Sequence, residues 1–542
     1  MVYRKIIPAY PSGRSQEDII ERIPMNRDDM IARLGDSSEK WDFIIIGGGA
    51  TGIGTAIEAA SRGYKVLLLE QSDFGKGTSS RSTKLIHGGI RYLKQGNISL
   101  VLEALKERGV LNKNAPHLVK NLPFVVPSYD WWEGPFYGIG LKLYDLLAGK
   151  EGFGESKILS KEKTLELIPT IENRGLKGGV IYHDGQFDDS RLIINMAQTA
   201  YEQGATLLNY VKVTGFMKKG MYISGVIVHD IEGDKEYQIE SLVVINATGV
   251  FSDNIRRLAD QYIEPMISPS QGIHIILNKS FLPGESAIMI PQTDDGRVLF
   301  AIPWHNSVIV GTTDTPIKQI SLEPIPLEEE IDFLISHAAR YLSKDPTKSD
   351  ILSVFAGLRP LVKQGDVDNT ANLSRDHTVH ISPTGLLTIA GGKWTTYRKM
   401  AEDTIDNAIV LGALDFKPSS TQNLNIHGYH KNPEIFNELS DYGSDASEIK
   451  KLYEEKKEYA QLIHPDKATR IGEVIWAVRN EMARTVEDFL SRRTRHLLLD
   501  VRTSIEMAPV VANWMAKELK KGISWKRLQI SEYIKIANNY LP

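Results

Sequence analysis

The stretch Trp41-Asp-Phe-Ile-Ile-Ile-Gly47-Gly-Gly49-Ala-Thr-Gly52-Ile-Gly54 decides the fold of this chain. Its apolar run before the first glycine is typical of a strand buried on both faces. The run leads directly into a Gly-x-Gly-x-x-Gly turn, after which small and apolar residues recur at helical spacing. In such a turn Gly47 permits the tight bend, Gly49 lets the backbone approach a pyrophosphate, and Gly52 lets the helix pack against the strand. The stretch therefore predicts a dinucleotide-binding unit of strand, turn and helix.

A carboxylate follows at the position that such a unit requires. A second apolar strand, 66–69, ends at Glu70, 18 residues after Gly52. An acid there accepts hydrogen bonds from an adenosine ribose, while the helix N-terminus offers free N–H groups and a partial positive charge to phosphates. A glycine turn of an ordinary α/β sheet is the alternative, but the flanking elements and Glu70 favour nucleotide binding.

The composition limits the classes of function. The chain has 542 residues, enough for two or three domains, and a net charge of −4, which argues against nucleic acid as a partner. It contains no cysteine, so disulfides, iron–sulfur clusters, zinc–thiolate sites and cysteine nucleophiles are excluded, and we assign no metal site. No apolar run approaches the roughly 18 residues of a membrane span. We therefore expect a cytoplasmic protein whose membrane contact, if it has one, is peripheral.

A hydroxyl-rich loop follows the second strand, with the sequence Gly75-Lys-Gly-Thr-Ser-Ser-Arg-Ser-Thr-Lys-Leu-Ile-His-Gly-Gly-Ile-Arg-Tyr-Leu93. Hydroxyls and free backbone N–H groups suit phosphate and flavin-ring oxygens. A solvated Ser/Thr loop is the alternative, but the close sequel of His87 and Arg91 around a glycine pair favours a loop that lines a cofactor. The predicted contacts in this loop are Thr78, Ser79, Ser80, Ser82, Thr83, Lys84, Leu85 and His87.

The rest of the chain predicts an α/β protein in three parts. A Rossmann-like nucleotide-binding domain covers about 41–115, 185–264 and 355–415, and a mostly antiparallel domain, 116–184 and 265–354, is inserted into it. Residues 1–40 are interpreted as an N-terminal arm, and 416–542 as an all-α C-terminal domain. A buried strand that ends at Ala247, Thr248 and Gly249, and a second strand with a double glycine at 386–398, point to the same nucleotide.

Two segments are candidates for contact with lipid. The aromatic-rich segment 122–149 contains Trp131 and Trp132, which either bury in a core or face a bilayer, and the core interpretation is the one we favour. Arg492, Arg493 and Arg495 in the C-terminal domain either meet anionic lipid or belong to a solvated or salt-bridged helix face.

Together these motifs resemble the FAD-dependent glycerol-3-phosphate dehydrogenases, which belong to the D-amino-acid-oxidase-like flavoproteins. The resemblance extends from about 41 to 500 and is weak at 1–40 and 415–465. It is carried by the first glycine turn with Glu70, by TSSRSTKLIHGGIRY at 78–92, by GLRP at 357–360, by GGKWTTYR at 391–398 and by 481–493.

The resemblance implies a noncovalent FAD that accepts a hydride at flavin N5 as sn-glycerol 3-phosphate is oxidised to dihydroxyacetone phosphate. It also implies that the electrons pass to a membrane quinone from an enzyme on the inner face of the cell membrane. Besides the loop, the predicted cofactor contacts are Gly47, Gly49, Gly52, Glu70, Val213, Ala247, Thr248, Gly249, Gly392, Lys393, Trp394 and Thr395.

The substrate and catalytic residues are expected from the chemistry of a phosphorylated secondary alcohol. Arg91 and Arg359 suit the phosphate because a guanidinium binds it in a bidentate manner. Lys393 suits the hydroxyl oxygen, and His87 or His274 is the expected base, since a histidine near its ordinary pKa is available at neutral pH. Tyr92 and Thr395 are expected as lesser substrate contacts.

Alternatives remain at this point. The oxidase branch of the family, which passes electrons to oxygen and forms peroxide, shares the same motifs. Its members tend to carry an extra segment in the substrate domain, where this chain is compact. A flavin-binding scaffold without catalysis and an NAD-dependent Rossmann dehydrogenase are further alternatives. The scaffold conflicts with four intact residues, His87, Arg91, Arg359 and Lys393, and the NAD-dependent enzyme leaves the turn at 391–398 without a role. The oligomeric state, including a homodimer, is not determined by the sequence.

Overall fold

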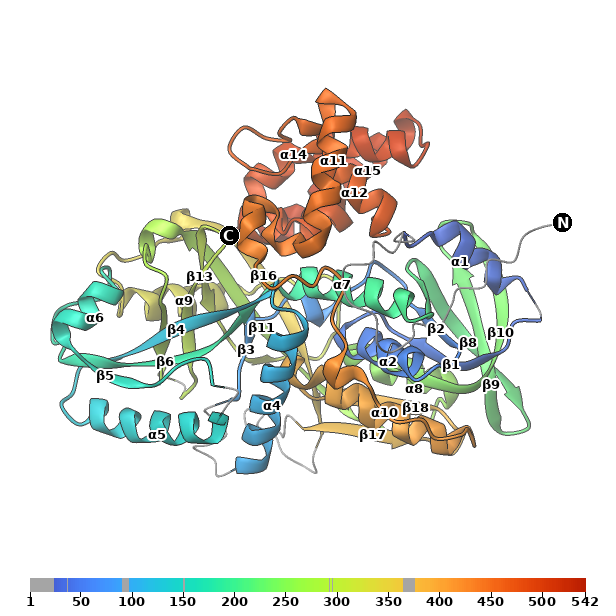
Figure 1. Cartoon of the computed structure of the whole chain (residues 1–542), viewed down its shortest axis with the longest axis horizontal. Helices are drawn as coiled ribbons and strands as arrows, with labels where there is room; N and C mark the ends of the chain where they lie inside the picture. Colours follow the sequence, from blue (N-terminus) through green and yellow to red (C-terminus); the bar gives the residue numbers. More distant parts are fainter. Residues whose placement is uncertain are drawn as a thin grey trace.

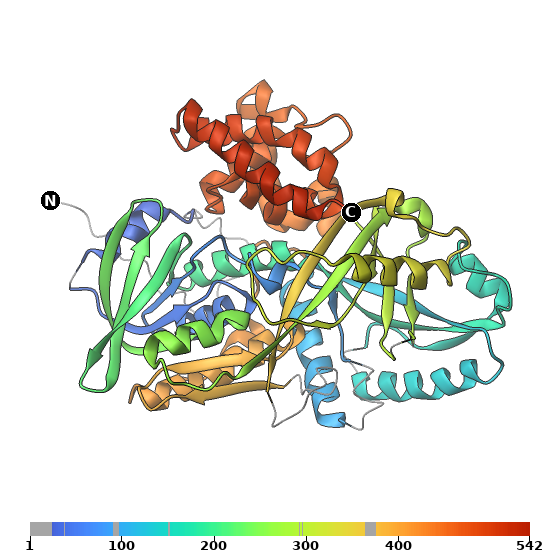
Figure 2. The same cartoon turned by 180° about the vertical axis from the view of Figure 1, so that it is seen from behind.

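The structure is a computed structural model that describes residues 24–36, 38–89, 97–149, 152–291, 293–294, 296–363 and 376–542. Two sheets lie side by side with helices around them, and the C-terminal helices gather above their junction (Figures 1 and 2). The predicted α/β fold class, with an inserted antiparallel domain and an all-α C-terminal domain, is confirmed.

The smaller sheet has a parallel core built from the apolar strands that the sequence predicts. Its path is β17-β18-β10-β1-β2-β7, in which β1 pairs in parallel with both β10 and β2, and the hairpin β8–β9 extends it. The strands are β1 (Trp41–Ile46), β2 (Val66–Leu69), β7 (Thr206–Leu208), β8 (Val211–Lys219), β9 (Tyr222–Asp230), β10 (Lys235–Asn246), β17 (His377–Ile381) and β18 (Leu387–Gly391). The helices that follow or flank these strands are α1 (Arg27–Leu34), α2 (Ala50–Ser61), α7 (Asp189–Glu202), α8 (Ser252–Ala259) and α10 (Tyr397–Leu411).

The larger sheet has ten strands, and its described pairs are antiparallel except for β12 with β4. Its strands are β3 (Leu85–Ile86), β4 (Val119–Ser128), β5 (Lys157–Ser160), β6 (Gly178–Phe187), β11 (Ile267–Asn278), β12 (Ala287–Ile290), β13 (Leu299–Trp304), β14 (Ser307–Gly311), β15 (Thr315–Pro316) and β16 (Ile351–Val362). The helices of this half are α4 (Ile98–Asn114), α5 (Glu133–Ala148), α6 (Lys161–Leu167) and α9 (Glu328–Ala339). Because β16 pairs with β11 as far as Val362, the second insertion ends later than the predicted boundary at 354.

Residues 416–542 form helices and short helical turns, and their described part contains no strand. The main elements are η9 (Pro433–Asp445), α11 (Ala446–Glu455), α12 (Ile471–Asn480), η11 (Asp488–Arg493), α13 (His496–Leu499), α14 (Val501–Glu518), α15 (Ile523–Ala537) and η12 (Asn538–Tyr540).

Arg492, Arg493 and Arg495 are buried in ion pairs, so the hypothesis that they meet anionic lipid is wrong. Arg492 Nε lies 2.6 Å from Asp73 Oδ2, and Arg493 Nη2 donates to Asp73 Oδ1 at 3.0 Å. Asp73 follows β2, so these pairs connect the C-terminal helices to the nucleotide-binding half. An unpaired guanidinium would be costly at such burial, and the carboxylate offsets that cost.

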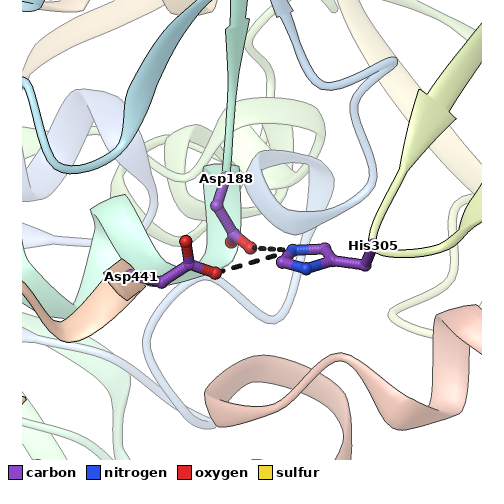
Figure 3. A group of neighbouring side chains, drawn as sticks. All are labelled: Asp188, His305 and Asp441. Atoms are coloured by element: carbon purple, nitrogen blue, oxygen red, sulfur yellow. Dashed lines mark hydrogen bonds and ion pairs between the residues drawn. The ribbon is translucent and has the colours of Figure 1, made fainter. Parts of the chain in front are cut away.

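A cluster of Asp188, His305 and Asp441, which Figure 3 shows, joins three parts of the molecule, and Arg495 binds its two carboxylates. Asp188 begins α7, His305 lies in the turn between β13 and β14, and Asp441 belongs to the C-terminal helices. His305 Nε2 lies 3.1 Å from Asp188 Oδ2, and Arg495 contacts Asp188 at 2.8 Å and Asp441 at 2.9 Å. Burial raises the pKa of the Asp188 carboxyl, but Arg495 and then His305 outweigh it and hold that pKa below its ordinary value. Although one ligand atom from each of Asp188, His305 and Asp441 lies close enough for a metal, the Arg495 guanidinium already pairs with both carboxylates, and we assign the cluster to domain contact.

The expectation that Trp131 and Trp132 bury in a core is also wrong, because their side chains are 83% and 47% exposed. They precede α5, which buries Leu141 and Tyr144 and turns its other face to solvent. In the described part of the chain, no helix combines the length and the apolar character needed to cross a membrane.

Replacement of Asp188 should show how much the three-part junction contributes to stability. Asp188→Asn keeps an oxygen that can cap α7 at the Arg191 amide but removes the charge. We expect the free energy of unfolding near neutral pH to fall by about 3 kcal/mol, the lower end of the cost of breaking a buried pair, because Asp441 still pairs with Arg495.

The pH dependence of this effect follows from the lowered pKa of folded Asp188. Its stabilisation is present above the unfolded pKa of about 3.9 and is lost as the pH falls through the folded value. The difference between wild type and variant in urea unfolding should therefore shrink in acid below about pH 4. The exposed Asp234→Asn is the control, and a difference that does not change with pH would contradict this account.

Candidate functional site

A cavity of about 630 Å³ opens at the carboxyl ends of β1, β2 and β10, where a ligand of an open parallel sheet is expected. It also reaches the glycine pair after β18. The predicted cofactor residues that line it are Gly47, Gly49, Glu70, Thr78, Ser79, Val213, Ala247, Thr248, Gly249, Gly392, Lys393 and Trp394. The predicted residues outside this lining are Gly52, Ser80, Ser82, Thr83, Lys84, Leu85, His87 and Thr395.

The first glycine turn brings the N-terminus of α2 to the cavity. Gly47 has φ +110°, and a Cβ there would lie 2.7 Å from the Ala247 carbonyl oxygen. At Gly52, which faces away from the cavity, a Cβ would lie 1.9 Å from the Gly47 carbonyl oxygen. The helix can thus approach the turn only because this position has no side chain, as the motif predicts. Gly49 is the N-cap residue, and its extended backbone leaves the helix end open to the cavity.

Glu70 is oriented by the backbone at the end of β2. Its carboxylate accepts the Gly48 N–H at 2.6 Å and the Ser72 N–H at 2.8 Å. Burial raises the pKa of this carboxyl above its ordinary value, and the two amides oppose that shift. The arrangement fixes a hydrogen-bond acceptor at the cavity wall, as the ribose role requires.

The second glycine turn is joined to the hydroxyl-rich loop. Gly391 and Gly392 both have positive φ, at 78° and 76°. The Trp394 indole N–H donates to the Ser79 carbonyl at 2.8 Å, and the His87 amide donates to Thr395 Oγ1 at 3.3 Å. Two segments more than 300 residues apart therefore form one wall of the site, with Lys393 between the glycines and Trp394.

The loop uses several of its polar side chains to hold itself in place. Lys84 Nζ contacts both Asp189 oxygens at 2.7 Å and donates to the Ser80 carbonyl at 2.7 Å. Ser82 Oγ donates to Asp189 Oδ2 at 2.7 Å. The hydroxyl of Ser82 and the ammonium of Lys84 are thus engaged with the start of α7, and the contact of these two residues with the cofactor stays a prediction. Burial lowers the pKa of Lys84, and Asp189 opposes that shift.

Arg359 lies on β16, and the next residue, Pro360, lines the cavity. Its guanidinium covers Gly272, where a Cβ would lie 2.3 Å from Nη2. The guanidinium is held by the Gln271 carbonyl at 3.2 Å, Thr312 Oγ1 at 3.2 Å, the Thr313 carbonyl at 2.8 Å and Asp314 Oδ1 at 3.3 Å. With 20% of its side chain exposed, this cation is fixed in direction and still accessible to a small ligand.

His274 lies between the loop and Arg359. Its ring stacks on Phe355 at 4.9 Å between centroids, and Nε2 lies 2.9 Å from Thr83 Oγ1. Burial, then the charges of Lys84 and Arg359, lower the pKa of His274 well below its ordinary value. A base works best when its pKa is near the operating pH, so this environment favours His87 over His274 as the base.

Two contacts join predicted site residues, one between His87 and Thr395 and the other between Thr83 and His274. Arg91 and Tyr92 lie outside the described residues. The sequence did not identify Ile320, Ser321 and Leu322, which also line the cavity. They lie in an irregular segment between β15 and α9 and carry no motif, so only their position in space reveals them.

Comparison with known proteins extends these observations. Residues 42–398 match the family described as FAD dependent oxidoreductase, and 383–526 match the C-terminal domain of alpha-glycerophosphate oxidase. The chain is 38% identical over 557 residues to the mitochondrial glycerol-3-phosphate dehydrogenase of Mus musculus, covering 96% of this chain and 76% of the mouse protein.

Among solved structures, the glycerol-3-phosphate dehydrogenase from Bacillus halodurans complexed with FAD is similar with a TM-score of 0.79 and 29% identity, over 96% of this chain and 98% of that one. The L-alpha-glycerophosphate oxidase from Mycoplasma pneumoniae shares the fold, with a TM-score of 0.56 and 18% identity over 71% of this chain and 98% of that one. The residues of the cavity fit FAD, because an open helix N-terminus, an oriented acid and a second glycine turn line one elongated site.

A charged residue at the N-cap of α2 should separate phosphate recognition from folding. Gly49 has an extended backbone that both Asn and Asp adopt as N-cap residues. Gly49→Asp puts a carboxylate where the pyrophosphate binds, whereas Gly49→Asn adds a similar volume without charge. We expect the Asp variant to bind FAD at least about tenfold more weakly than the Asn variant, a difference of about 1.4 kcal/mol.

The measurement is a titration of each apoprotein with FAD, followed by flavin fluorescence, with unfolding temperatures as the check on folding. Equal affinities in the two variants would place the phosphates away from this helix end.

Proposed function

Because this chain belongs to the family of FAD-dependent glycerol-3-phosphate dehydrogenases, we propose that it oxidises sn-glycerol 3-phosphate to dihydroxyacetone phosphate and passes the electrons to a membrane quinone. The observation that carries this proposal is the fixed guanidinium of Arg359 beside a cavity built for FAD. Oxygens of neighbouring residues, among them the Thr313 carbonyl and the Asp314 carboxylate, hold that cation, and a phosphate dianion matches its planar, bidentate donor set.

The remaining residues have roles that follow from the chemistry of a secondary alcohol. FAD, when bound, supplies the hydride acceptor at N5. His87 takes the proton of the C2 hydroxyl, and Lys393 stabilises the negative charge that develops on its oxygen, while the C2 hydrogen leaves as hydride. The alcohol thus loses one proton and one hydride and becomes the ketone. Arg91, Tyr92 and Thr395 are proposed as further substrate contacts.

FAD is proposed to bind along the first glycine turn and Glu70, with its flavin end near Gly392 and Lys393. The domain division into a nucleotide-binding part, an inserted substrate part and a helical C-terminal part belongs to the same proposal. The substrate part contributes Arg359 and His274, and the nucleotide-binding part contributes His87 and Lys393.

The quinone acceptor requires contact with a membrane, and we propose that the outer face of α5 makes it. All residues of α5 are described, and its exposed face contains Phe136, Ile139, Leu143 and Leu146 with Lys142 as its charged residue. Ile139 and Leu146 are 75% and 76% exposed. An apolar face with tryptophans at one end and a lysine at its edge suits the interface of a bilayer better than water.

The first experiment mixes the anaerobic holoenzyme with glycerol 3-phosphate and follows the loss of flavin colour. Arg359→Ala should lower the rate of flavin reduction at limiting substrate. The loss should correspond to about 2–5 kcal/mol of transition-state free energy, the cost of losing a buried charge partner. Arg359→Lys should be intermediate, because an ammonium lacks the guanidinium fork. The rate with glycerol, which has no phosphate, should fall little in the same variant. Arg340→Ala, on the surface, is the matched control.

Equal losses with glycerol and glycerol 3-phosphate would mean that Arg359 supports the flavin or the sheet instead. The oxidative half-reaction distinguishes a quinone acceptor from oxygen. Reoxidation of the reduced flavin should be fast with a soluble quinone analogue and slow in air. Fast peroxide formation would move the chain to the oxidase branch and leave the result on Arg359 unaffected.

The second experiment tests the membrane face. A triple variant of α5, with Phe136, Ile139 and Leu146 each changed to Gln, should bind phosphatidylcholine–phosphatidylglycerol vesicles at least about 100-fold more weakly. Each side chain is worth about 1.5–3 kcal/mol when fully buried. Tyr262→Gln with Val410→Gln removes two other exposed apolar side chains and should bind as wild type. Unchanged vesicle binding in the triple variant, with a loss of self-association instead, would make the face a contact between two copies.

A further inference from the structure

The segment Ile320–Leu322 forms part of the cavity wall without belonging to any helix or strand. It lies between β15 and α9 and lines the same cavity as Lys76 and Gly77 of the hydroxyl-rich loop. An irregular segment has no ladder of hydrogen bonds to hold it, so its position depends on side-chain anchors. The anchor is the next residue, Glu323.

Glu323 is held by three groups from two distant parts of the chain. Its Oε2 lies 2.8 Å from Arg81 Nη2 and accepts the Tyr540 hydroxyl at 3.2 Å, and its Oε1 lies 3.5 Å from Lys76 Nζ. Arg81 also donates to the carbonyl of Leu322 at 3.2 Å. The hydroxyl-rich loop therefore binds both the backbone of Leu322 and the side chain of the next residue, Glu323.

Arg81 belongs to the hydroxyl-rich motif, and its guanidinium is buried away from solvent. Besides the wall segment it contacts the Ala356 carbonyl of β16 at 3.2 Å and lies 5.8 Å above the ring of Tyr540. Burial alone would lower the pKa of Arg81, but Glu323 and its neighbours raise it above its ordinary value. Its charge is therefore committed to this contact.

The C-terminal helices hold the other side of the same cluster. Lys76 Nζ lies 2.6 Å from Glu487, and Glu487 lies 2.7 Å from Arg492, which pairs with Asp73 after β2. The cations Lys76 and Arg81 are thus balanced by Glu323 and Glu487. Removal of Glu323 would leave the buried Arg81 and the half-buried Lys76 with Glu487 as their remaining described carboxylate, and would release the wall segment from these partners.

We propose that Glu323 is a positioning residue for FAD, which fastens the wall segment Ile320–Leu322 to the hydroxyl-rich loop and, through Tyr540, to the C-terminal helices. Under this proposal, FAD leaves the cavity only when the contacts of Glu323 with Arg81, Lys76 and Tyr540 break. The proposal concerns retention of the cofactor and is independent of the substrate and of the electron acceptor.

The test measures the rate at which FAD dissociates from the holoenzyme, as the rise in flavin fluorescence after dilution into a large volume of buffer. Glu323→Gln keeps the shape and loses the charge, and should release FAD about 10- to 100-fold faster, the range expected for loss of one partner of a buried charge pair. Tyr540→Phe keeps the ring and loses one hydrogen bond, and should release FAD about two- to tenfold faster. Glu329→Gln, an exposed glutamate in the first turn of α9, is the matched control and should behave as wild type.

A second measurement separates positioning from general stability. The unfolding midpoints of the apoproteins in urea should differ little among Tyr540→Phe, Glu329→Gln and wild type, while the FAD release rate of Tyr540→Phe differs. The proposal is overturned if Glu323→Gln and Tyr540→Phe release FAD at the wild-type rate. It is equally overturned if the release rates of all variants simply follow their apoprotein midpoints. If Glu323→Gln does not fold, the comparison of Tyr540→Phe with Glu329→Gln decides the question.

Discussion

The close approach of α2 to the turn after β1 is the constraint on which the rest of the structure depends. A Cβ at Gly52 would lie 1.9 Å from the Gly47 carbonyl oxygen, so any side chain there would push the helix away. With the helix in contact, its N-terminus, the acid at the end of β2 and the end of β10 all meet at one point. The cavity, the position of the hydroxyl-rich loop beside it and the second glycine turn opposite are built outward from that contact.

Buried charge connects the three parts of the molecule around this centre. Asp73, Asp188 and Asp189 each lie at the end of an element of the nucleotide-binding half, and each pairs with a cation from another segment. Such pairs contribute little net stability when compared with apolar packing, but each is costly to separate. These pairs therefore determine which surfaces meet. In the hydroxyl-rich loop, Ser82 and Lys84 bind Asp189, whereas Thr78 and Ser79 line the cavity.

The parts of the fold that the sequence predicts are those governed by local rules. The glycine turn, the apolar strands at 43–46 and 243–246 and the acid at Glu70 each follow from neighbouring residues, and the structure has them as expected. Long-range partners carry no such signal. The sequence alone suggests that Arg492 is a surface charge. Its partner Asp73 lies more than 400 residues away in the chain, and only the structure places the two side by side. Trp131 reads as a core residue because apolarity alone does not say which face of α5 meets the protein.

The same principle separates the cations proposed to bind a ligand from those that hold the fold. Arg81, Lys84 and Arg493 are buried and matched by carboxylates at short distance, so their charge is already neutralised. Arg359 differs, because its carboxylate partner Asp314 is 3.3 Å away and a fifth of its side chain is exposed. Lys393 is half-buried on the cavity wall itself. A motif identifies all of these positions equally, whereas burial and the position at the cavity distinguish the cations proposed to bind a phosphate or a developing oxyanion from those that hold the fold.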